Sequence, residues 1–569
     1  MIFNSLFPDA NIPNVDLATY VLEEGKRRFG QSKVSDNYAL FDTQSNQSLT
    51  INQLDDQTRL LASGLYNKLG LRSNDTLLIH SPNSSNFVVT VLGTLKLGGI
   101  VTFANPAYNS RELAHQISDS KPSFIATCLD SLPTLFDAIK ISGVEIPTAR
   151  IFTIDSVETN LQGIRSISQV FGYEPFPRFS ISNKQELVSK CAFLPYSSGT
   201  TGLAKGVVLS HQNIVSNIIQ TNIYATLNNW HNDPSKIQRY IGVLPWYHIY
   251  GLVICLFSGL ANGVGVVSMP KFQMQSFLKN VSIHKISIAH LVPPILINLV
   301  NDKTVENYDI SSIKFFTTAA APIGKELMLN LASKFKSIRV VKIYGVTESS
   351  PMISCAPYWN TEIESSGILT CNMQAKVIDE DGVELGIGQI GELLFKGPNI
   401  MVGYLNNPTS TAATIDADSF LHTGDIGYFD AYGNLFVVDR KKELIKYKGF
   451  QVPPAELEAL LLGHPHVADA AVIGKYVENQ ATEVPKAFIT LKKDLPPNTT
   501  VESASSSIKD WVDSQVSNHK KLRGGVHVID VIPKSAAGKI LRRVLRDNYN
   551  KDDSPASAAE GISNIKPKL

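Results

Sequence analysis

Short apolar runs alternate with longer amphipathic segments across the first 350 residues of this chain. The amphipathic segments, such as 51–70 and 86–99, repeat apolar residues at spacings near three and four, which predicts helices. The apolar runs predict buried strands within 76–80, 100–104, 122–128, 150–154, 263–269, 287–292, 313–319 and 339–345. This alternation predicts an α/β fold of open, largely parallel sheets with helices on both faces.

The pattern changes after residue 370. Segments 376–386 and 426–439 place Asp and Gly between alternating apolar residues, which predicts hairpins of a small antiparallel β subdomain. Beyond Arg440 we expect a loop, a helix that Pro453 and Pro454 open, and a small α+β domain. Its further strands and helix are predicted within 467–474, 487–491, 507–516 and 526–532. The domains are therefore predicted at 1–440 and 441–550, followed by a Ser/Ala/Asp-rich disordered tail at 551–569.

The charge balance gives no reason to expect a nucleic-acid or anionic-membrane partner. Lys and Arg number 52 and Asp and Glu 51, for a net charge of +1. The five cysteines are scattered and never spaced C-x-x-C, so we expect neither a disulfide framework nor a zinc site. Segment 241–270 lacks charged residues, but Pro245 and its glycines indicate a buried interrupted helix and a strand rather than a membrane span.

One loop, 196–206, combines Ser, Thr and Gly residues with a lysine in the sequence YSSGTTGLAKG. Backbone N–H groups that side chains do not shield favour phosphate binding. The loop follows a predicted strand at 191–195, and we expect it to lead directly into a helix at 208–219. It is not a Walker P-loop, because Ala204 precedes Lys205 and Gly206 follows it.

Three further stretches carry side chains suited to nucleotide chemistry. In 344–351 (YGVTESSP), Thr347 offers a hydroxyl and Glu348 a hard oxygen ligand for Mg²⁺. In 421–428 (LHTGDIGY), Asp425 can accept both hydroxyls of a ribose, and 533–543 (PKSAAGKILRR) presents Lys539 before a helix. With these motifs in order from about residue 30 to 546, the chain resembles the acyl-adenylate-forming superfamily of acyl-CoA synthetases and firefly luciferase. It is most similar to the 4-coumarate–CoA ligase branch.

The resemblance implies a two-step ligase that uses ATP, Mg²⁺ and coenzyme A. A carboxylic acid and ATP give an acyl-adenylate and pyrophosphate, and the CoA thiol then displaces AMP. Domain 1–440 would bind AMP and the acyl group, and 441–550 would be a mobile catalytic domain with its hinge at Lys442. The implied catalytic residues are Lys539, Thr347, Glu348 (the metal ligand) and His248. The implied cofactor-binding residues are Ser197, Ser198, Gly199, Thr200, Thr201, Gly202, Lys205, Ala320, Ala321, Pro322, Tyr344, Gly345, Asp425, Arg440, Lys446, Lys448, Gly449 and Gln451.

The sequence says least about the pocket that would bind the carboxylic acid substrate. The resemblance implies that it is lined by His248, Tyr250, Ala319, Gly345, Pro351 and Met352. Ala319 stands where such enzymes usually have glycine, and Met352 replaces a smaller aliphatic residue, so both should reshape the pocket. None of these positions carries a cationic side chain that would bind a second carboxylate of the substrate. We therefore expect an aryl or medium-chain monocarboxylic acid as the substrate.

Other functions remain open on the same motifs. A luciferase-like adenylating monooxygenase and a carrier-protein-loading adenylating enzyme share them, whereas a non-catalytic nucleotide-binding protein should have lost Lys539, Glu348 or Asp425. The terminal Pro567, Lys568 and Leu569 resemble the S-K-L address, so we expect the peroxisomal import receptor as a partner and the peroxisome as the location. The cytoplasm is the alternative location.

Overall fold

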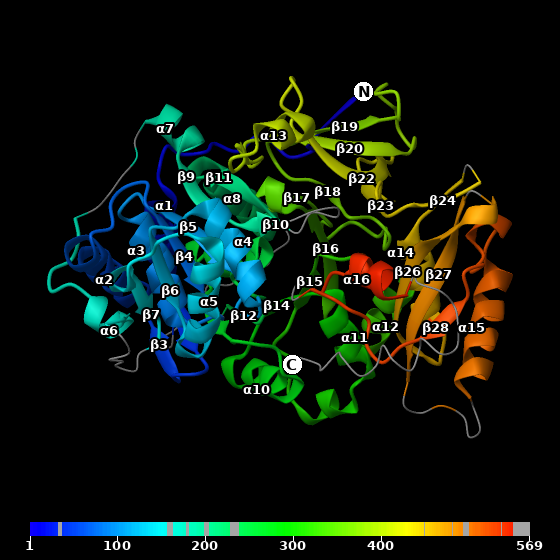
Figure 1. Cartoon of the computed structure of the whole chain (residues 1–569), viewed down its shortest axis with the longest axis horizontal. Helices are drawn as coiled ribbons and strands as arrows, with labels where there is room; N and C mark the ends of the chain where they lie inside the picture. The colour runs from blue at the N-terminus through cyan, green and yellow to red at the C-terminus, as the bar shows by residue number, and fades with distance from the viewer. Residues whose placement is uncertain are drawn as a thin grey trace.

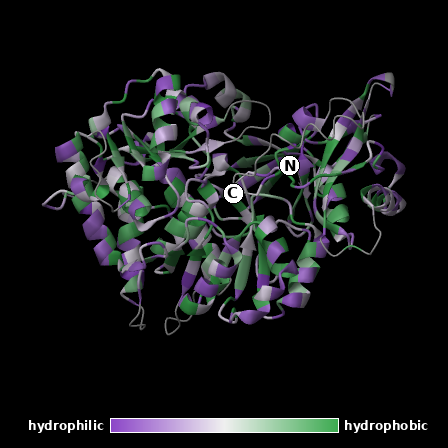
Figure 2. Ribbon diagram, turned by 60° about the horizontal axis from the view of Figure 1, so that its bottom comes forward, coloured by the Kyte–Doolittle hydropathy of each residue, from purple (hydrophilic) through white to green (hydrophobic). Residues whose placement is uncertain are grey.

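Two nine-stranded sheets form the greater part of the computed structural model, and the apolar runs of the sequence supply their central strands (Figure 1). The structure describes residues 1–31, 37–155, 163–177, 181, 183–197, 204–227, 238–448, 450–480, 482–492, 495, 500–535 and 538–549. The predicted α/β fold class is confirmed. In Figure 2 the inner strands are mainly green, and purple hydrophilic segments gather on the outer helices.

The first sheet has the strand order β10-β11-β9-β5-β4-β6-β7-β8, with β21 paired to β11. Its neighbours from β9 through β5, β4, β6 and β7 to β8 are parallel. The strands are β4 (Thr76–His80), β5 (Ile100–Ala104), β6 (Phe124–Thr127), β7 (Ile151–Thr153), β8 (Arg165–Ser166), β9 (Cys191–Leu194), β10 (Tyr196–Ser197), β11 (Lys205–Ser210) and β21 (Gly403–Tyr404). The helices of this part are α2 (Ile51–Gly64), α3 (Ser85–Leu95), α4 (Ser110–Ser120), α5 (Leu132–Ser142), α6 (Ile167–Val170) and α7 (Lys184–Ser189).

The second sheet has the order β18-β17-β16-β15-β14-β12-β13-β2-β3. Its strands are β2 (Leu40–Asp42), β3 (Gln47–Leu49), β12 (Arg239–Gly242), β13 (Gly265–Ser268), β14 (Ile288–Leu291), β15 (Phe315–Thr318), β16 (Arg339–Gly345), β17 (Met352–Cys355) and β18 (Ile368–Leu369). Its helices are α1 (Leu17–Phe29), α8 (His211–Leu227), a π-helix (Tyr250–Phe257), α9 (Ser258–Ala261), α10 (Met274–His284), α11 (Pro293–Asn301) and α12 (Lys325–Lys334).

The uncharged segment 241–270 lies inside this second layer. It begins within β12, continues through the fully buried π-helix and α9, and ends after β13. Across the residues that the structure describes, no helix has both the length and the apolar character needed to cross a membrane. The segment is therefore core of the sheet layer, as predicted.

The antiparallel subdomain and the C-terminal unit follow in the chain. The subdomain has the order β1 (Ile2–Asn4), β19 (Gln374–Ile378), β20 (Gly391–Lys396), β22 (Leu421–Phe429) and β23 (Leu435–Arg440), with α13 (Pro408–Thr414) beside it. The C-terminal unit contains β24 (Ile445–Tyr447), β25 (Phe450–Val452), α14 (Pro454–Gly463), β26 (Val467–Val477), β27 (Thr482–Leu491), α15 (Val501–Gln515), β28 (Val526–Val528) and α16 (Arg542–Tyr549). Its apolar core is separate from the large core of the preceding residues. The domain boundary near Arg440 stays a prediction.

The loop 196–206, which is predicted to bind phosphate and is called the phosphate-type loop below, is not followed directly by a helix. We expected a helix directly after it at 208–219, but β11 continues to Ser210 and α8 begins only at His211. The loop therefore joins β10 to β11, which pair in antiparallel register from Tyr196 opposite Gly206. The cause is that Val207 and Leu209 are fully buried between neighbouring strands, so the β-branched run extends the sheet before the helix starts.

Candidate active site

The carboxyl ends of β15 and β16 place two of the predicted motifs next to each other. These strands are parallel neighbours, with Thr318 opposite Lys342, so the segments that follow them leave the same edge of the sheet. Ala320, in the turn after β15, has a φ of +72°, in the left-handed region that alanine seldom adopts. Ala320 and Pro322 are exposed and Ala321 is partly buried, which leaves this turn accessible to a flat base.

A buried carboxylate links the end of β16 to the antiparallel subdomain. Asp425 in β22 is 3% exposed and lies opposite Arg440 in β23. The Tyr344 hydroxyl donates to Asp425 Oδ2 at 2.7 Å, and Arg440 Nε lies 3.1 Å from Asp425 Oδ1. Burial, with Asp425 adding to it, raises the pKa of Tyr344 well above its ordinary value, so the phenol remains a donor. The remaining lone pairs of this fixed carboxylate can accept two ribose hydroxyls.

Glu348 is held by a residue that the sequence did not indicate. The Tyr404 hydroxyl donates to Glu348 Oε1 at 2.8 Å, and the Met401 N–H donates to the Glu348 carbonyl oxygen at 2.8 Å. Thr347 lies beside Glu348 in the same short 3₁₀ turn. Tyr404 ends the two-residue strand β21, and no spacing in the sequence connects it to the motif at 344–351. Only the pairing of β21 with β11 brings it there.

Lys205, which is predicted to bind phosphate, lies beside Tyr404 and so belongs to the same group of residues as Glu348. Lys205 Nζ lies 4.9 Å from the centre of the Tyr404 ring and donates to Ser410 Oγ at 3.0 Å. Ser197 lies opposite Lys205 in the β10–β11 pair, and both are partly buried. The other predicted residues of this loop, Ser198, Gly199, Thr200, Thr201 and Gly202, lie outside the described residues.

The donor set around Glu348 fits Mg²⁺ when a nucleotide supplies the other ligands. The described residues contain no group of three or more His, Cys, Asp or Glu side chains arranged for a metal. Mg²⁺ characteristically takes one or two carboxylates, several waters and substrate phosphates rather than an all-protein cage. Glu348 is partly exposed, and its Oε1 is oriented by Tyr404, which is the arrangement such a site requires.

Lys539 reaches this site from the C-terminal unit. Its turn is closed by a bond of 2.8 Å from the Ser535 N–H to the Lys539 carbonyl oxygen. The turn lies against α11, since a Cβ added to Gly538 would come within 3.1 Å of Pro294 Cδ. Burial, and then the positive charge of Arg440, lowers the pKa of Lys539 to about 8. The structure thus brings together Lys539 and the Asp425–Arg440 pair.

The residues predicted for the acid pocket lie in the second layer. Burial, and then the charge of Lys539, lowers the pKa of His248 to about 4, so the imidazole is neutral near pH 7. The Tyr250 hydroxyl lies 3.1 Å from Thr317 Oγ1, at the carboxyl end of β15. Pro351 and Met352 are buried, with Met352 at 1% exposure.

Two small residues complete this wall. A Cβ at Gly345 would overlap the Pro351 carbonyl oxygen, so the glycine permits close approach of the two segments. Ala319 is partly buried against the large core at the start of the turn after β15. Gly345 on β16 lies opposite the bulky Met352 on β17, and Ala319 follows β15, the strand on the other side of β16.

The predicted hinge residue Lys442, the thioester-step residues Lys446 and Lys448, and the adenylation-step residue Gln451 lie elsewhere in this orientation. Lys442, Lys446 and Lys448 are exposed, and Gln451 Nε2 donates to Glu380 Oε1 at 2.9 Å. Among the described residues no hydrogen bond or ion pair joins them to the Asp425–Arg440 pair. Gly449 lies outside the described residues.

Comparisons with known proteins agree with this arrangement. The model of the AMP-binding enzyme family matches residues 28–405, and that of the AMP-binding enzyme C-terminal domain matches 456–539. The chain is 38% identical over 559 residues to "Probable 4-coumarate--CoA ligase 1" of Dictyostelium discoideum, which covers 96% of this chain and 97% of that protein. It is also 38% identical over 565 residues to "4-coumarate--CoA ligase 1" of Petroselinum crispum, with 98% of each covered.

A solved structure shares the fold over almost the whole chain. The anthranilate CoA ligase AuaEII, in complex with anthranoyl-AMP, superposes with a TM-score of 0.82 at 21% identity. The match covers 95% of this chain and 97% of that one. At that identity the likeness is one of fold.

Proposed function

Because the chain belongs to the AMP-binding enzyme family, we propose that it is an AMP-forming acid–CoA ligase that works through an acyl-adenylate. The observation that carries this proposal is the convergence of three elements far apart in the sequence. The Asp425–Arg440 pair offers a ribose site, Glu348 offers a metal ligand, and Lys539 of the C-terminal unit lies where the charges of Arg440 and Asp425 act on it.

In the first step a carboxylate oxygen attacks the α-phosphorus of ATP, and the bond to the bridging oxygen of pyrophosphate breaks. Two anions must approach each other, so positive charge at the reacting centre lowers the barrier. Lys539 would place its ammonium between carboxylate and α-phosphate, and Thr347 would donate to an α-phosphate oxygen. Mg²⁺ on Glu348 would neutralise phosphate charge. Ser197 and Lys205, with the loop between them, would hold the pyrophosphate as it leaves.

In the second step the CoA sulfur attacks the acyl carbonyl carbon, and the bond to the AMP oxygen breaks. A stable phosphate monoanion is a far better leaving group than oxide. We propose that the C-terminal unit turns about Lys442 between the steps, which withdraws Lys539 and brings Lys446, Lys448 and Gly449 to the CoA. Gln451 would serve the first step. The neutral His248 would border the acid and gate its pocket.

The acid is proposed to be an aryl or medium-chain monocarboxylic acid. The buried Met352 side chain and the Ala319 methyl group support a short or reshaped pocket. In a closely packed wall, one additional methylene is enough to change which substrates fit. The curated relatives are named for 4-coumarate, which makes hydroxycinnamic acids the first candidates to try.

A panel of carboxylic acids, scored for AMP release with and without CoA, tests the proposal. We expect AMP and acyl-CoA in equal amounts for at least one aryl or medium-chain acid. AMP release with light emission and no thioester would favour a luciferase-like monooxygenase instead. Release that requires a carrier protein rather than CoA would favour a carrier-loading enzyme, and no AMP with any acid would refute adenylation.

We also propose that the enzyme resides in the peroxisome through its terminal Pro567, Lys568 and Leu569. These residues lie outside the described residues, and the proposal rests on their likeness to the S-K-L address. A fluorescent fusion that leaves the C-terminus free should co-localise with a peroxisomal marker, and deletion of the last three residues should release it. A cytoplasmic signal from the intact fusion would contradict the proposal.

A further inference from the structure

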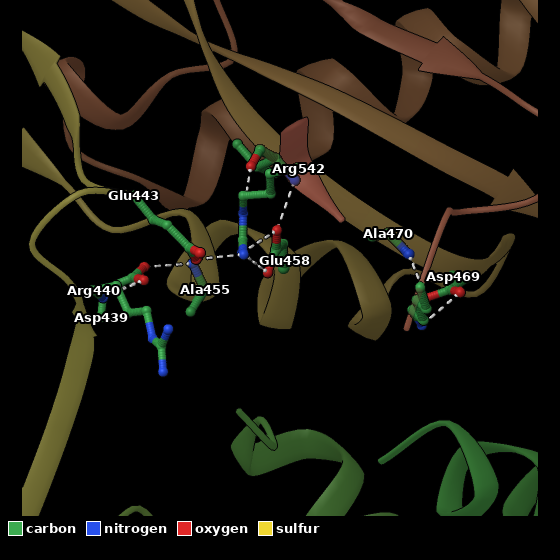
Figure 3. A network of polar contacts seen from close by, with 10 residues as sticks. Asp439, Arg440, Glu443, Ala455, Glu458, Asp469, Ala470 and Arg542 are labelled. Carbon is green, nitrogen blue, oxygen red and sulfur yellow. Dashed lines mark hydrogen bonds and ion pairs between the residues drawn. The ribbon is translucent and has the colours of Figure 1, made fainter. Parts of the chain in front are cut away.

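A buried network of charged side chains surrounds the predicted hinge and extends to the segment that carries Lys539. Its members are Asp439, Glu443, Glu458 and Arg542, each between 6% and 9% exposed (Figure 3). Asp439 is the next-to-last residue of β23, Glu443 follows Lys442, Glu458 lies on α14, and Arg542 begins α16. Three carboxylates and one guanidinium thus meet in a volume from which water is largely excluded.

Arg542 joins the other two members that follow the hinge, Glu443 and Glu458. Its Nη1 donates to Glu443 Oε2 at 2.6 Å, and its Nη2 donates to both Glu458 oxygens at 2.7 and 2.8 Å. Its Nε donates to the Val472 carbonyl oxygen at 3.1 Å. Because Arg542 comes three residues after Lys539, these bonds tie the lysine turn, α14 and the first residues after the hinge into one unit.

Asp439 is the member of this network that precedes the hinge. Its Oδ2 accepts a hydrogen bond of 3.0 Å from the Ala455 N–H, in the first turn of α14. The residue at the cap position of α14 is Pro453, whose side chain makes no capping bond. The carboxylate that satisfies this helix start therefore comes from β23, on the other side of Lys442.

We infer that Asp439 is a positioning residue that caps α14 across the hinge and so selectively stabilises the domain orientation in which Lys539 meets the nucleotide site. The inference rests on the proposed function, because it assumes that the C-terminal unit turns about Lys442. A rotation there moves Ala455 with α14 and leaves Asp439 on β23, so the bond must break. Among the described residues, the other side-chain hydrogen bond between these two parts, from Gln451 to Glu380, is exposed and contributes little. The Glu443 and Leu444 N–H groups also donate to the Arg440 carbonyl oxygen, but these bonds form the local turn around Lys442 and do not reach α14.

The test separates the two half-reactions in the full-length enzyme. In Asp439→Ala the equilibrium constant between the two domain orientations should change by about fivefold, against the orientation described here. That is the usual effect of losing a helix cap. Acyl-AMP formation should slow by up to that factor, whereas conversion of supplied acyl-AMP by CoA keeps its wild-type rate. Asp439→Asn should behave as wild type, because Asn caps a helix as well as Asp does.

A matched control and a second readout keep the test independent of simple destabilisation. Thr500 caps α15 in the same C-terminal unit but does not bridge the hinge, so Thr500→Ala should change neither half-reaction. Hydrogen–deuterium exchange should be faster in Asp439→Ala for the peptides that contain Pro294 and Lys539, whose segments touch in this orientation. The control should show faster exchange only near α15.

Two results would overturn the inference. Equal slowing of both half-reactions would mean that Asp439 acts by holding its neighbour Arg440, whose N–H it also binds at 2.7 Å. Unchanged exchange at the two peptides would mean that the cap does not hold the orientation. If the wild-type enzyme itself forms no acyl-AMP, the proposed function fails, and the exchange experiment alone decides whether Asp439 joins the two parts.

Discussion

The hydroxyl of Tyr344 donates a hydrogen bond of 2.7 Å to the carboxylate of Asp425, 81 residues later in the chain. Tyr344 lies near the end of a strand of the second sheet, and Asp425 lies in the antiparallel subdomain. The pair therefore fixes the distance between the surface where an adenine would stack and the carboxylate where a ribose would bind. It also fixes the orientation of the carboxylate before any nucleotide arrives.

Substitution within this pair should weaken nucleotide binding in a graded way. Asp425→Asn replaces an acceptor oxygen by a donor, and kcat/KM for ATP should fall roughly 10- to 100-fold, as for hydrogen bonds to a charged group. Tyr344→Phe keeps the ring but loses the hydroxyl, and should raise KM for ATP about fivefold. Steady-state kinetics with varied ATP check both, and an Asp425→Asn enzyme with normal KM and kcat would contradict the assignment.

Acyl-AMP formation should decline above pH 8 because Lys539 must carry its proton. A lysine is charged below its pKa, and burial lowers the pKa of Lys539 to about 8. The kcat/KM of the adenylation half-reaction, which reports the free enzyme, should therefore fall about tenfold per pH unit above that value. Lys539→Arg keeps its charge at every accessible pH and should lack this decline.

Removal of the Lys539 side chain supplies the companion experiment. Lys539→Ala should lower adenylation by roughly 100-fold or more, the usual loss for a charge-stabilising donor. Thioester formation from supplied acyl-AMP should be retained, because the lysine has no role in that step. Near-normal adenylation in this variant, or the same alkaline decline in Lys539→Arg, would remove Lys539 from the mechanism.

Tyr404 should set the magnesium requirement through Glu348. Tyr404→Phe leaves Glu348 Oε1 without its 2.8 Å donor, so the carboxylate loses its fixed orientation. The Mg²⁺ concentration for half-maximal adenylation should rise by about tenfold, as for other partners of metal ligands. Tyr428→Phe is the control, since that ring stacks on Phe436 at 4.8 Å. Identical Mg²⁺ curves for the Tyr404→Phe enzyme and the control would contradict this role.

The acid pocket should widen when its two unusual residues are replaced. Ala319→Gly and Met352→Val remove atoms from the proposed wall, and the preference should shift toward bulkier acids. Met352→Val should also cost about 1–2 kcal/mol of unfolding free energy, since Met352 is 1% exposed. Met373→Val is the control, because Met373 is equally buried but not among the predicted pocket residues. An equal change of substrate preference in the control, or no change in Ala319→Gly and Met352→Val, would show that these residues do not line the acid pocket.

Helices and strands with strong periodicity could be predicted from the sequence alone. Segment 51–70 forms a helix that ends at Gly70, whose φ of +84° suits a glycine. Two local expectations were wrong. After the loop 196–206, β11 precedes α8, and the segment predicted as a loop after Arg440 contains the antiparallel pair β24–β25. Val207 and Leu209 are compatible with either structure locally, and only their burial between strands selects the sheet.

The order of motifs along the chain indicated the family and the reaction class, because it resembles the motif order of known acyl-adenylate-forming enzymes. The residues assigned to the nucleotide stay predictions. The tertiary structure decided which distant groups meet. The hydrogen bond from Tyr404 to Glu348 joins residues 56 positions apart, and the one from Ala455 to Asp439 joins residues 16 positions apart. No sequence motif predicts either contact. Contacts of this kind depend on how sheets and domains pack, and that packing is set by the burial of the whole apolar surface rather than by any single segment.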